Sequence, residues 1–126
     1  MTFFVDNNLS PQLARGMAAF GEDVTHLQDH YSPDAADTDW LPRIGQEQWI
    51  LLTRDDRVRF NPAELAALKQ HRVGAFFLGG KGRSRWDIIQ QVVRNWPRMN
   101  ELADRTARPF AFRVPPQGSK IDRIPL

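Results

Sequence analysis

The feature that most constrains the fold is an apolar run that ends abruptly in charged residues. Residues 49–52 are all apolar, and Thr53, Arg54 and the pair Asp55–Asp56 follow directly. An unbroken apolar run of this length, stopped by polar residues, predicts a strand that is buried on both faces. The two aspartates then lie where the strand leaves the sheet, which is the edge where open parallel sheets bind ligands.

A second stretch, at the N-terminus, has the same design. Residues 3–5 are apolar and stop at Asp6, which Asn7 and Asn8 follow. Two buried strands that both end in aspartate bring carboxylates to one edge of a sheet. Carboxylate oxygens are the ligands that hard divalent cations prefer.

The remaining chain alternates predicted strands with predicted helices. The strands are expected at residues 3–5, 24–27, 49–52 and 73–78, and the helices at 10–21, from 37, from 61 and at 86–96. This alternation predicts an α/β domain with a mostly parallel sheet of four to five strands. We expect a single domain over 1–126, with an α/β core at 1–98 and an extension at 99–126.

Helix signals set further expectations. Ser10 is followed by proline and predicts an N-cap, and Asp37 is predicted to cap the second helix. Apolar spacing predicts two buried stripes, one of Leu13, Met17 and Phe20, and one of Ile89, Val92, Val93 and Trp96.

Right-handed crossovers place the carboxyl ends of all the parallel strands at one edge. That edge is expected to collect the acidic residues Asp6, Asp37, Asp55 and Asp56. The strand at 73–78 ends in glycines and then in the basic residues Lys81, Arg83 and Arg85. This glycine-rich loop lacks the spacing of a P-loop.

The charge is strongly segregated, although the net charge is only +2. Residues 1–56 carry −7 and residues 57–126 carry +9. An acidic half joined to a basic half suggests a cation site beside a face that binds a polyanion, whereas ordinary solvated surface charge is the plainer alternative.

Composition excludes several classes of protein. The chain has no cysteine, which excludes disulfides and thiolate metal sites. His26 and His30 are four residues apart but are expected at a strand end and in a loop, so they are a weak candidate for zinc. No apolar run approaches membrane-spanning length, and no signal-peptide pattern is visible, so we expect a cytoplasmic protein without a membrane partner.

Three blocks of the sequence resemble the PIN-like superfamily and, within it, the VapC-type ribonuclease toxins of toxin–antitoxin pairs. The blocks are residues 4–11, Asp37 to Trp40, and Leu52 to Asp55, in that order. The resemblance covers most of residues 3–96. It implies a three-layer α/β/α fold and a ribonuclease that depends on Mg²⁺ or Mn²⁺.

The same resemblance implies roles for individual residues. Asp6, Asp37 and Asp55 match the acidic metal ligands, which are also the catalytic residues. The auxiliary positions are Asn8, Asp39, Thr53 and Asp56. The implied partners are an RNA substrate and a cognate antitoxin protein.

Two alternatives to a ribonuclease remain open from the sequence. One is a PIN-like module that binds RNA or a partner with little or no catalysis, since strand 73–78 ends without an acidic residue. The other is a receiver-like phosphoacceptor, which an aspartate after the first strand and Lys81 after a later strand would suit.

The basic loop and the C-terminal extension carry the binding expectations. Lys81, Arg83 and Arg85 are expected to contact RNA phosphates, since such contacts position a substrate without reading its sequence. Trp86 either stacks on a base or belongs to the core. Residues 109–124 are expected to form a hairpin with a half-buried edge strand, which serves a homodimer, an antitoxin segment or the core of its own domain.

Overall fold

The computed structural model describes residues 1–54 and 62–126. The strands are β1 (Phe3–Val5), β2 (Val24–His26), β3 (Ile50–Arg54), β4 (Gly74–Leu78), β5 (Phe110–Val114) and β6 (Asp122–Ile124). The helices are α1 (Pro11–Ala19), α2 (Asp37–Glu47), α3 (Pro62–Gln70) and α4 (Arg85–Arg105), with a single 3₁₀ turn, η1 (Leu27–Asp29). The predicted alternation of strands and helices is confirmed.

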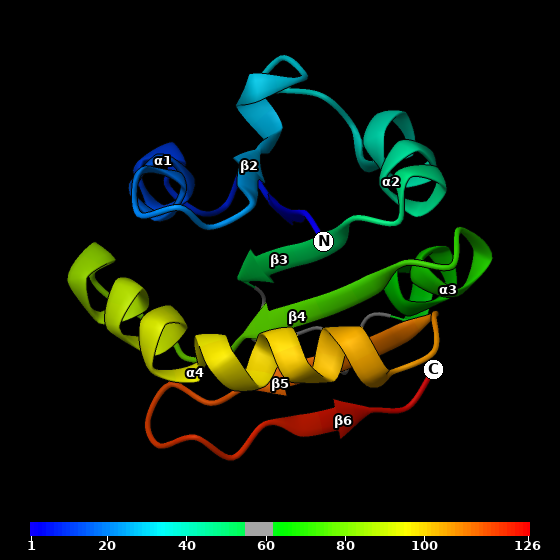
Figure 1. Ribbon diagram of the computed structural model, residues 1–126. Coiled ribbons are helices and arrows are strands. Elements are labelled where there is room, and N and C mark those ends of the chain that lie inside the picture. Colours follow the sequence, from blue (N-terminus) through cyan, green and yellow to red (C-terminus); the bar gives the residue numbers. More distant parts are fainter. Residues whose placement is uncertain (55–61) are drawn as a thin grey trace.

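The strands form one six-stranded sheet in the order β2-β1-β3-β4-β5-β6. β1 to β5 pair in parallel, and only β6 is antiparallel. In Figure 1 the arrowheads of β3 and β4 accordingly point the same way, and that of β6 points the other way. The mostly parallel sheet was predicted, but with four to five strands, because the hairpin was not expected to extend it.

The strand order reverses direction at β1. From β1 the chain moves outward to β2 and then returns to place β3 on the other side of β1. Such a reversal leaves a crevice at the carboxyl ends of the two strands that flank it, which is where open α/β sheets bind ligands. Here those ends belong to β1 and β3.

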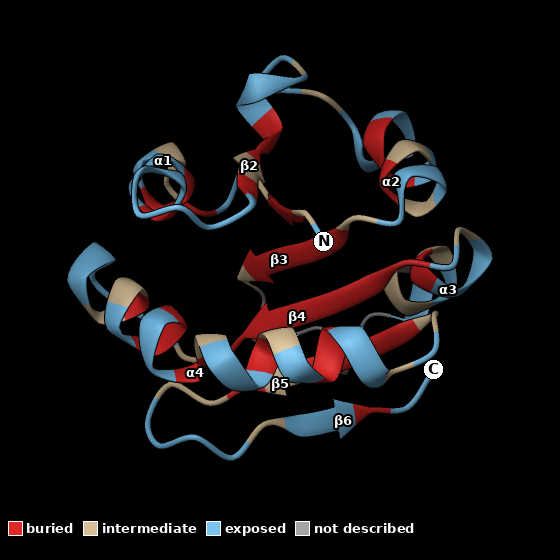
Figure 2. Cartoon of the chain, viewed as in Figure 1, coloured by how far each residue is buried: buried red, intermediate tan, exposed pale blue. Residues whose placement is uncertain are grey.

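Helices cover both faces of the sheet and give the three layers of an α/β/α fold. α1 and α4 pack on one face, over Phe3, Val5 and Phe76 among others. α2 and α3 pack on the opposite face, over Phe4 and Phe77. Figure 2 shows the result, with the central strands buried along their length and the helices buried only on their inner sides. The continuous apolar runs of β1, β3 and β4 follow from this double covering.

The two predicted N-caps differ in outcome. Ser10 caps α1 as expected, and its Oγ accepts a hydrogen bond from the backbone N–H of Gln12 at 3.1 Å. The prediction for Asp37 is wrong by one residue, because Ala36 is the N-cap of α2. The capping bond comes instead from Asp39, whose Oδ2 accepts from the Ala36 N–H at 3.1 Å. Asp37 is therefore the first residue of the helix.

The buried stripes of α1 and α4 also differ from the prediction. Phe20 is 90% exposed and Val93 is 57% exposed, because both lie on the solvent side of their helices. α4 continues through Pro97 to Arg105 and buries a longer stripe. Its members are Ile88, Gln91, Val92, Asn95, Met99, Leu102 and Ala103.

The prediction that β5 is a half-buried edge strand is wrong. β5 pairs with β4 on one side and with β6 on the other, so its edges are both occupied. Phe110, Phe112 and Val114 belong to the core layer under α1 and α4, and Ala111 belongs to the opposite layer. The hairpin therefore completes the core of its own domain, and β6 is the edge.

None of the helices in residues 1–54 and 62–126 is both long enough and apolar enough to cross a membrane.

Candidate active site

Asp6 lies at the crevice between β1 and β3. Its backbone N–H donates to the carbonyl oxygen of Leu52 at 2.9 Å, which continues the ladder one residue beyond β1. Its Oδ2 accepts a hydrogen bond from the Thr53 hydroxyl at 2.9 Å, and its Oδ1 accepts from the backbone N–H of Asn7 at 2.6 Å. These two bonds fix the orientation of the carboxylate.

Asn8 holds the end of β3 in place through its side-chain amide. Its Nδ2 donates to the Arg54 carbonyl at 2.6 Å, and its Oδ1 accepts from the Arg54 N–H at 3.1 Å. A side-chain amide carries the same donor and acceptor as a peptide group, so Asn8 pairs with β3 as a strand residue would. Asn8 Nδ2 also donates to Thr53 Oγ1 at 3.0 Å. Since Thr53 Oγ1 is the acceptor in this bond, its own hydrogen is free to be donated to Asp6.

Asn7 joins this corner to the segment that leads into α2. Its Nδ2 donates to the Pro33 carbonyl at 2.6 Å, and its Oδ1 accepts from Nε2 of Gln28 at 2.6 Å. The segment is thereby held beside the end of β1. The chain needs only a few further residues to reach Asp37.

Asp37, at the start of α2, lies close enough to Asp6 to interact electrostatically. Partial burial of the carboxyl and, to a smaller extent, the negative charge of Asp6 raise the pKa of Asp37. No hydrogen bond to the Asp37 carboxylate is found within the described residues. The fold therefore brings together two carboxylates that repel each other, a cost that a bound cation would remove.

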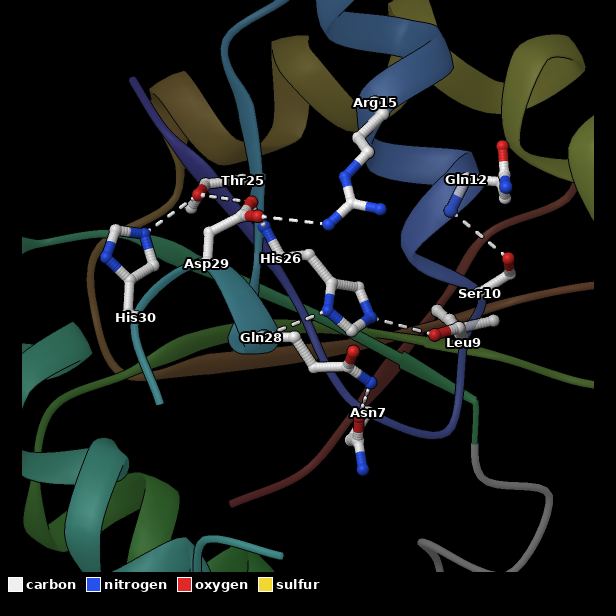
Figure 3. A network of polar contacts seen from close by, with 10 residues as sticks. All are labelled: Asn7, Leu9, Ser10, Gln12, Arg15, Thr25, His26, Gln28, Asp29 and His30. Carbon is white, nitrogen blue, oxygen red and sulfur yellow. Dashed lines mark hydrogen bonds and ion pairs between the residues drawn. The ribbon is translucent and has the colours of Figure 1, made fainter. Parts of the chain in front are cut away.

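His26 lies next to this corner and joins the segments that follow β1 and β2 (Figure 3). The ring is fully buried, its Nε2 contacts the Leu9 carbonyl at 2.8 Å, and its Nδ1 accepts from the backbone N–H of Gln28 at 3.0 Å. Both ring nitrogens are thus occupied by the backbone. His26 positions the loop after β1 and is unsuited to ligate zinc together with His30.

Asp29 fixes the same turn. Its Oδ2 accepts from the His26 N–H at 2.9 Å and from the Thr25 hydroxyl at 3.2 Å, and its Oδ1 lies 3.7 Å from Arg15 Nη2. These contacts, chiefly the bond from the His26 backbone, lower the pKa of Asp29. Figure 3 shows how the network joins α1, β2 and η1.

The metal ligands predicted from the sequence are only partly described. Asp55 and Asp56 lie outside the described residues. Within residues 1–54 and 62–126, no three histidine or carboxylate side chains gather as a metal site would require. Mg²⁺ is often held by one or two carboxylates together with waters and substrate phosphates, so the Asp6–Asp37 pair fits it.

The basic residues after β4 have unequal roles. Lys81 and Arg85 are exposed. Arg83 is half-buried, and its Nη2 donates to the carbonyls of Pro116 at 2.9 Å and Asp87 at 3.4 Å. Arg83 therefore joins the start of α4 to the turn after β5, a structural role that the sequence did not predict.

A groove of about 1020 Å³ was also missed by sequence reasoning. It lies between α1 and the first half of α4, and Asn7, Asn8 and Arg54 are among its lining residues. Asn8 connects the groove to the candidate site, because its side chain donates to Thr53, whose hydroxyl donates to Asp6. Phe20, Trp86 and Val93 line it and are exposed. Phe20 and Val93 had been assigned to the core. The one available signal was Ser84, a capping residue that places Trp86 in the exposed first turn of α4.

Fold and site together define a doubly wound α/β protein with paired carboxylates at the switch point of its sheet. The model of the PIN-like domain family matches residues 1–80, and the chain belongs to this family. PIN-like domains are generally nucleases. Neither the curated proteins nor the solved structures include a match to the chain.

Proposed function

We propose that this chain is an endoribonuclease that depends on Mg²⁺ or Mn²⁺. The observation that carries the proposal is the Asp6 carboxylate, which Thr53 and the Asn7 backbone orient at the switch-point crevice of a PIN-like fold, with Asp37 near enough to interact with it electrostatically. Asp55, which follows β3 directly in the sequence, is the proposed third ligand. A divalent cation at this site supplies a Lewis acid that activates water and neutralises charge on the phosphate.

The surrounding residues have distinct parts in this proposal. Thr53 and Asn8 orient the Asp6 carboxylate. Lys81 and Arg85 are exposed after β4 and hold the RNA backbone, with Arg54 as a further cation at the crevice. Asp39 caps α2 and thereby fixes the first turn of the helix, which also contains Asp37. Asp56 is proposed as an auxiliary residue.

Cation binding is the first test. Millimolar Mn²⁺ should raise the melting temperature of the wild-type protein, since a ligand that binds only the folded state stabilises it. Asp6→Asn and Asp37→Asn should abolish that rise and should be slightly more stable than wild type without cation, because carboxylate repulsion is relieved. Asp39→Asn is the matched control on the same helix and should keep the rise. If Mn²⁺ raises the melting temperatures of both Asp6→Asn and Asp37→Asn as much as that of wild type, these residues do not bind the cation.

Cleavage is the second test. Labelled RNA incubated with Mn²⁺ should be cut internally, leaving the phosphate on the 5′ end of the downstream fragment, and EDTA should stop the reaction. Asp6→Asn should lower the rate at least a hundredfold, because the metal contributes several kcal/mol to the transition state. Activity that survives EDTA, or a 2′,3′-cyclic phosphate product, is incompatible with hydrolysis by this site.

The resemblance to VapC-type sequences supports a finer proposal, that the nuclease is the toxin of a toxin–antitoxin pair in the cytoplasm. Expression of the chain alone should then arrest growth. Coexpression with a small DNA-binding protein encoded next to it should restore growth, and Asp6→Asn should be harmless alone. A homodimer remains part of this proposal, but β5 offers no exposed edge for it.

A second candidate function is favoured by one observation. β4 ends at Leu78 and is followed by Gly79, Gly80 and Lys81, so the chain has no acidic residue directly after this strand. A PIN-like module that binds RNA or a partner protein without cutting RNA would show cation binding and RNA binding, but no cleavage of any RNA.

A further inference from the structure

The groove between α1 and α4 is a large feature of the described surface that the proposed chemistry leaves unused. α1 is nine residues long, so the groove runs for about 13 Å beside it. Its floor is apolar and includes Leu13, Met17 and Ile88. Exposed apolar surface of this extent marks a binding site more often than chance.

The exposure of the Trp86 ring in this groove is explained by the local sequence at the start of α4. Ser84 Oγ accepts from the Asp87 N–H at 3.1 Å, and Asp87 Oδ2 accepts from the Ser84 N–H at 3.3 Å. This capping box starts α4 so that Trp86 falls in its first turn, with 70% of the residue exposed. The indole is thus held on a rigid helix end with its surface open to solvent.

The charges show which end of the groove faces the active site. Arg54, Arg83 and Arg85 line it together with Asn7 and Asn8. In the part of the chain that the structure describes, these arginines form no ion pair with a carboxylate. At the far end Glu22 accepts a hydrogen bond from Trp96 Nε1 at 2.6 Å. Unpaired cations therefore gather where the groove meets Asp6.

We propose that this groove binds the bases of single-stranded RNA next to the scissile phosphate, with Trp86 as the stacking platform and Arg54 and Arg85 as phosphate contacts. The proposal rests on the ribonuclease function proposed above. It follows from the position of Asn8, which lines the groove and contacts Asp6 through Thr53, and from the combination of cations with an exposed aromatic ring. Proteins bind single strands in this way without reading their sequence. Paired bases cannot reach the ring, so a duplex is excluded.

Binding without catalysis is the decisive measurement. We would measure anisotropy of a fluorescein-labelled eight-nucleotide RNA in EDTA, as a single strand, as a duplex, and as a strand with abasic central positions. Wild-type protein should prefer the intact single strand. Trp86→Ala should weaken that binding about tenfold, whereas Trp86→Phe should retain most of it. The abasic strand should bind wild type and Trp86→Ala equally, because it has no central bases that could stack on the Trp86 ring.

Charge is tested with a matched pair of variants on α4. Arg85→Ala should lower the affinity for all strands, including the abasic one, and reduce the salt slope by about one. Arg105→Ala removes the same charge from the far end of the same helix and should leave both quantities near the wild-type values. Circular dichroism checks that each variant keeps its fold.

Several outcomes would overturn the subsite. Stacking on Trp86 would be ruled out if Trp86→Ala bound RNA as tightly as wild type does. It would also be ruled out if wild-type protein bound the abasic strand as tightly as the intact strand. A dimer in solution that Trp86→Ala converts to a monomer, with RNA binding unchanged, would assign the groove to a second polypeptide instead.

The subsite and the nuclease can fail separately. Trp86-dependent binding in EDTA with no cleavage in Mn²⁺ would support the subsite and refute the nuclease. Cleavage by Trp86→Ala with an unchanged KM would support the nuclease and overturn the subsite.

Discussion

At the scale of single residues, the candidate site depends on side chains that replace backbone interactions. The side-chain amide of Asn8 forms two hydrogen bonds with the backbone of Arg54, as a residue of a neighbouring strand would. The ring nitrogens of His26 form hydrogen bonds with the Leu9 carbonyl and the Gln28 N–H. These contacts satisfy backbone groups at the end of β3 and in the segments that follow β1 and β2. The ends of the strands are thereby fixed, and with them the Asp6 carboxylate.

Asp29 gives a pH-dependent prediction at this scale. Its pKa is lowered in the folded protein, mainly by the hydrogen bond from the His26 backbone. A group whose folded pKa lies below its unfolded value adds stability above the unfolded pKa, and that stability is lost as the pH falls through the folded pKa. Asp29→Ala should therefore cost about 1 kcal/mol at neutral pH, and the difference from wild type should shrink below pH 4.

Urea unfolding at several pH values measures this difference. Asp104→Ala is the control, since Asp104 is exposed on α4 and makes no hydrogen bond or ion pair within the described residues. A difference between wild type and Asp29→Ala that stays constant from pH 7 to pH 3 would contradict the role of the carboxylate charge.

At the scale of elements, close contact between helices and their neighbours explains an internal glycine. Gly45 lies inside α2, which continues to Glu47. A Cβ at Gly45 would lie 2.1 Å from the backbone oxygen of His71, which follows α3. The glycine is needed for the approach of α2 to the end of α3 rather than for termination.

Two glycine substitutions test this reading. Gly45→Ala should destabilise the protein by about 1–3 kcal/mol, because the backbone at His71 must shift. Gly16→Ala in α1 is the matched control, since nothing lies within 4 Å of its added Cβ. Alanine is the better helix former there and should add about 0.5–1 kcal/mol. Thermal unfolding of both variants gives the comparison, and equal effects would refute the close-contact explanation.

At the scale of the whole molecule, the last strands complete the sheet. The family match ends at residue 80, but the core that covers the first strands includes α4 and β5. Gln91 of α4 donates from Nε2 to the carbonyls of Gly79 at 3.0 Å, Val114 at 3.2 Å and Pro115 at 3.0 Å. This buried amide ties the helix to the carboxyl ends of both β4 and β5.

Truncation after Arg108 should therefore prevent folding. The change removes three large or branched core side chains of β5 and exposes the full edge of β4, at a cost larger than the stability of most domains of this size. We expect loss of the cooperative thermal transition and of solubility. A truncated protein that unfolds cooperatively would show instead that residues 109–126 are a dispensable interface.

The sequence alone determined which segments form the strands of the acidic half and, for β1, where the strand ends. β3 continues two residues beyond the predicted end at Leu52, to Arg54, and β2 ends one residue earlier than predicted, at His26. An apolar run buried on both faces is a local signal, and a carboxylate directly after it needs no tertiary information to be placed at the sheet edge. The Ser10 cap and the proline at the start of α1 are equally local. Asp6 could be found for that reason, whereas Asn8 and Thr53 were implied by the resemblance to PIN-like sequences.

Only the tertiary structure decided how distant segments share surface. The switch at β1 places Thr53 against Asp6, and the contacts of Asn7 bring the segment before Asp37 to the same corner. β5 is buried at four of its five residues and has β6 along its second edge. Trp86 is exposed because the Ser84 cap places it in the first turn of α4. The spacing of apolar residues predicts which face of a helix or strand is apolar. Whether that face is buried depends on which other elements of the fold pack against it.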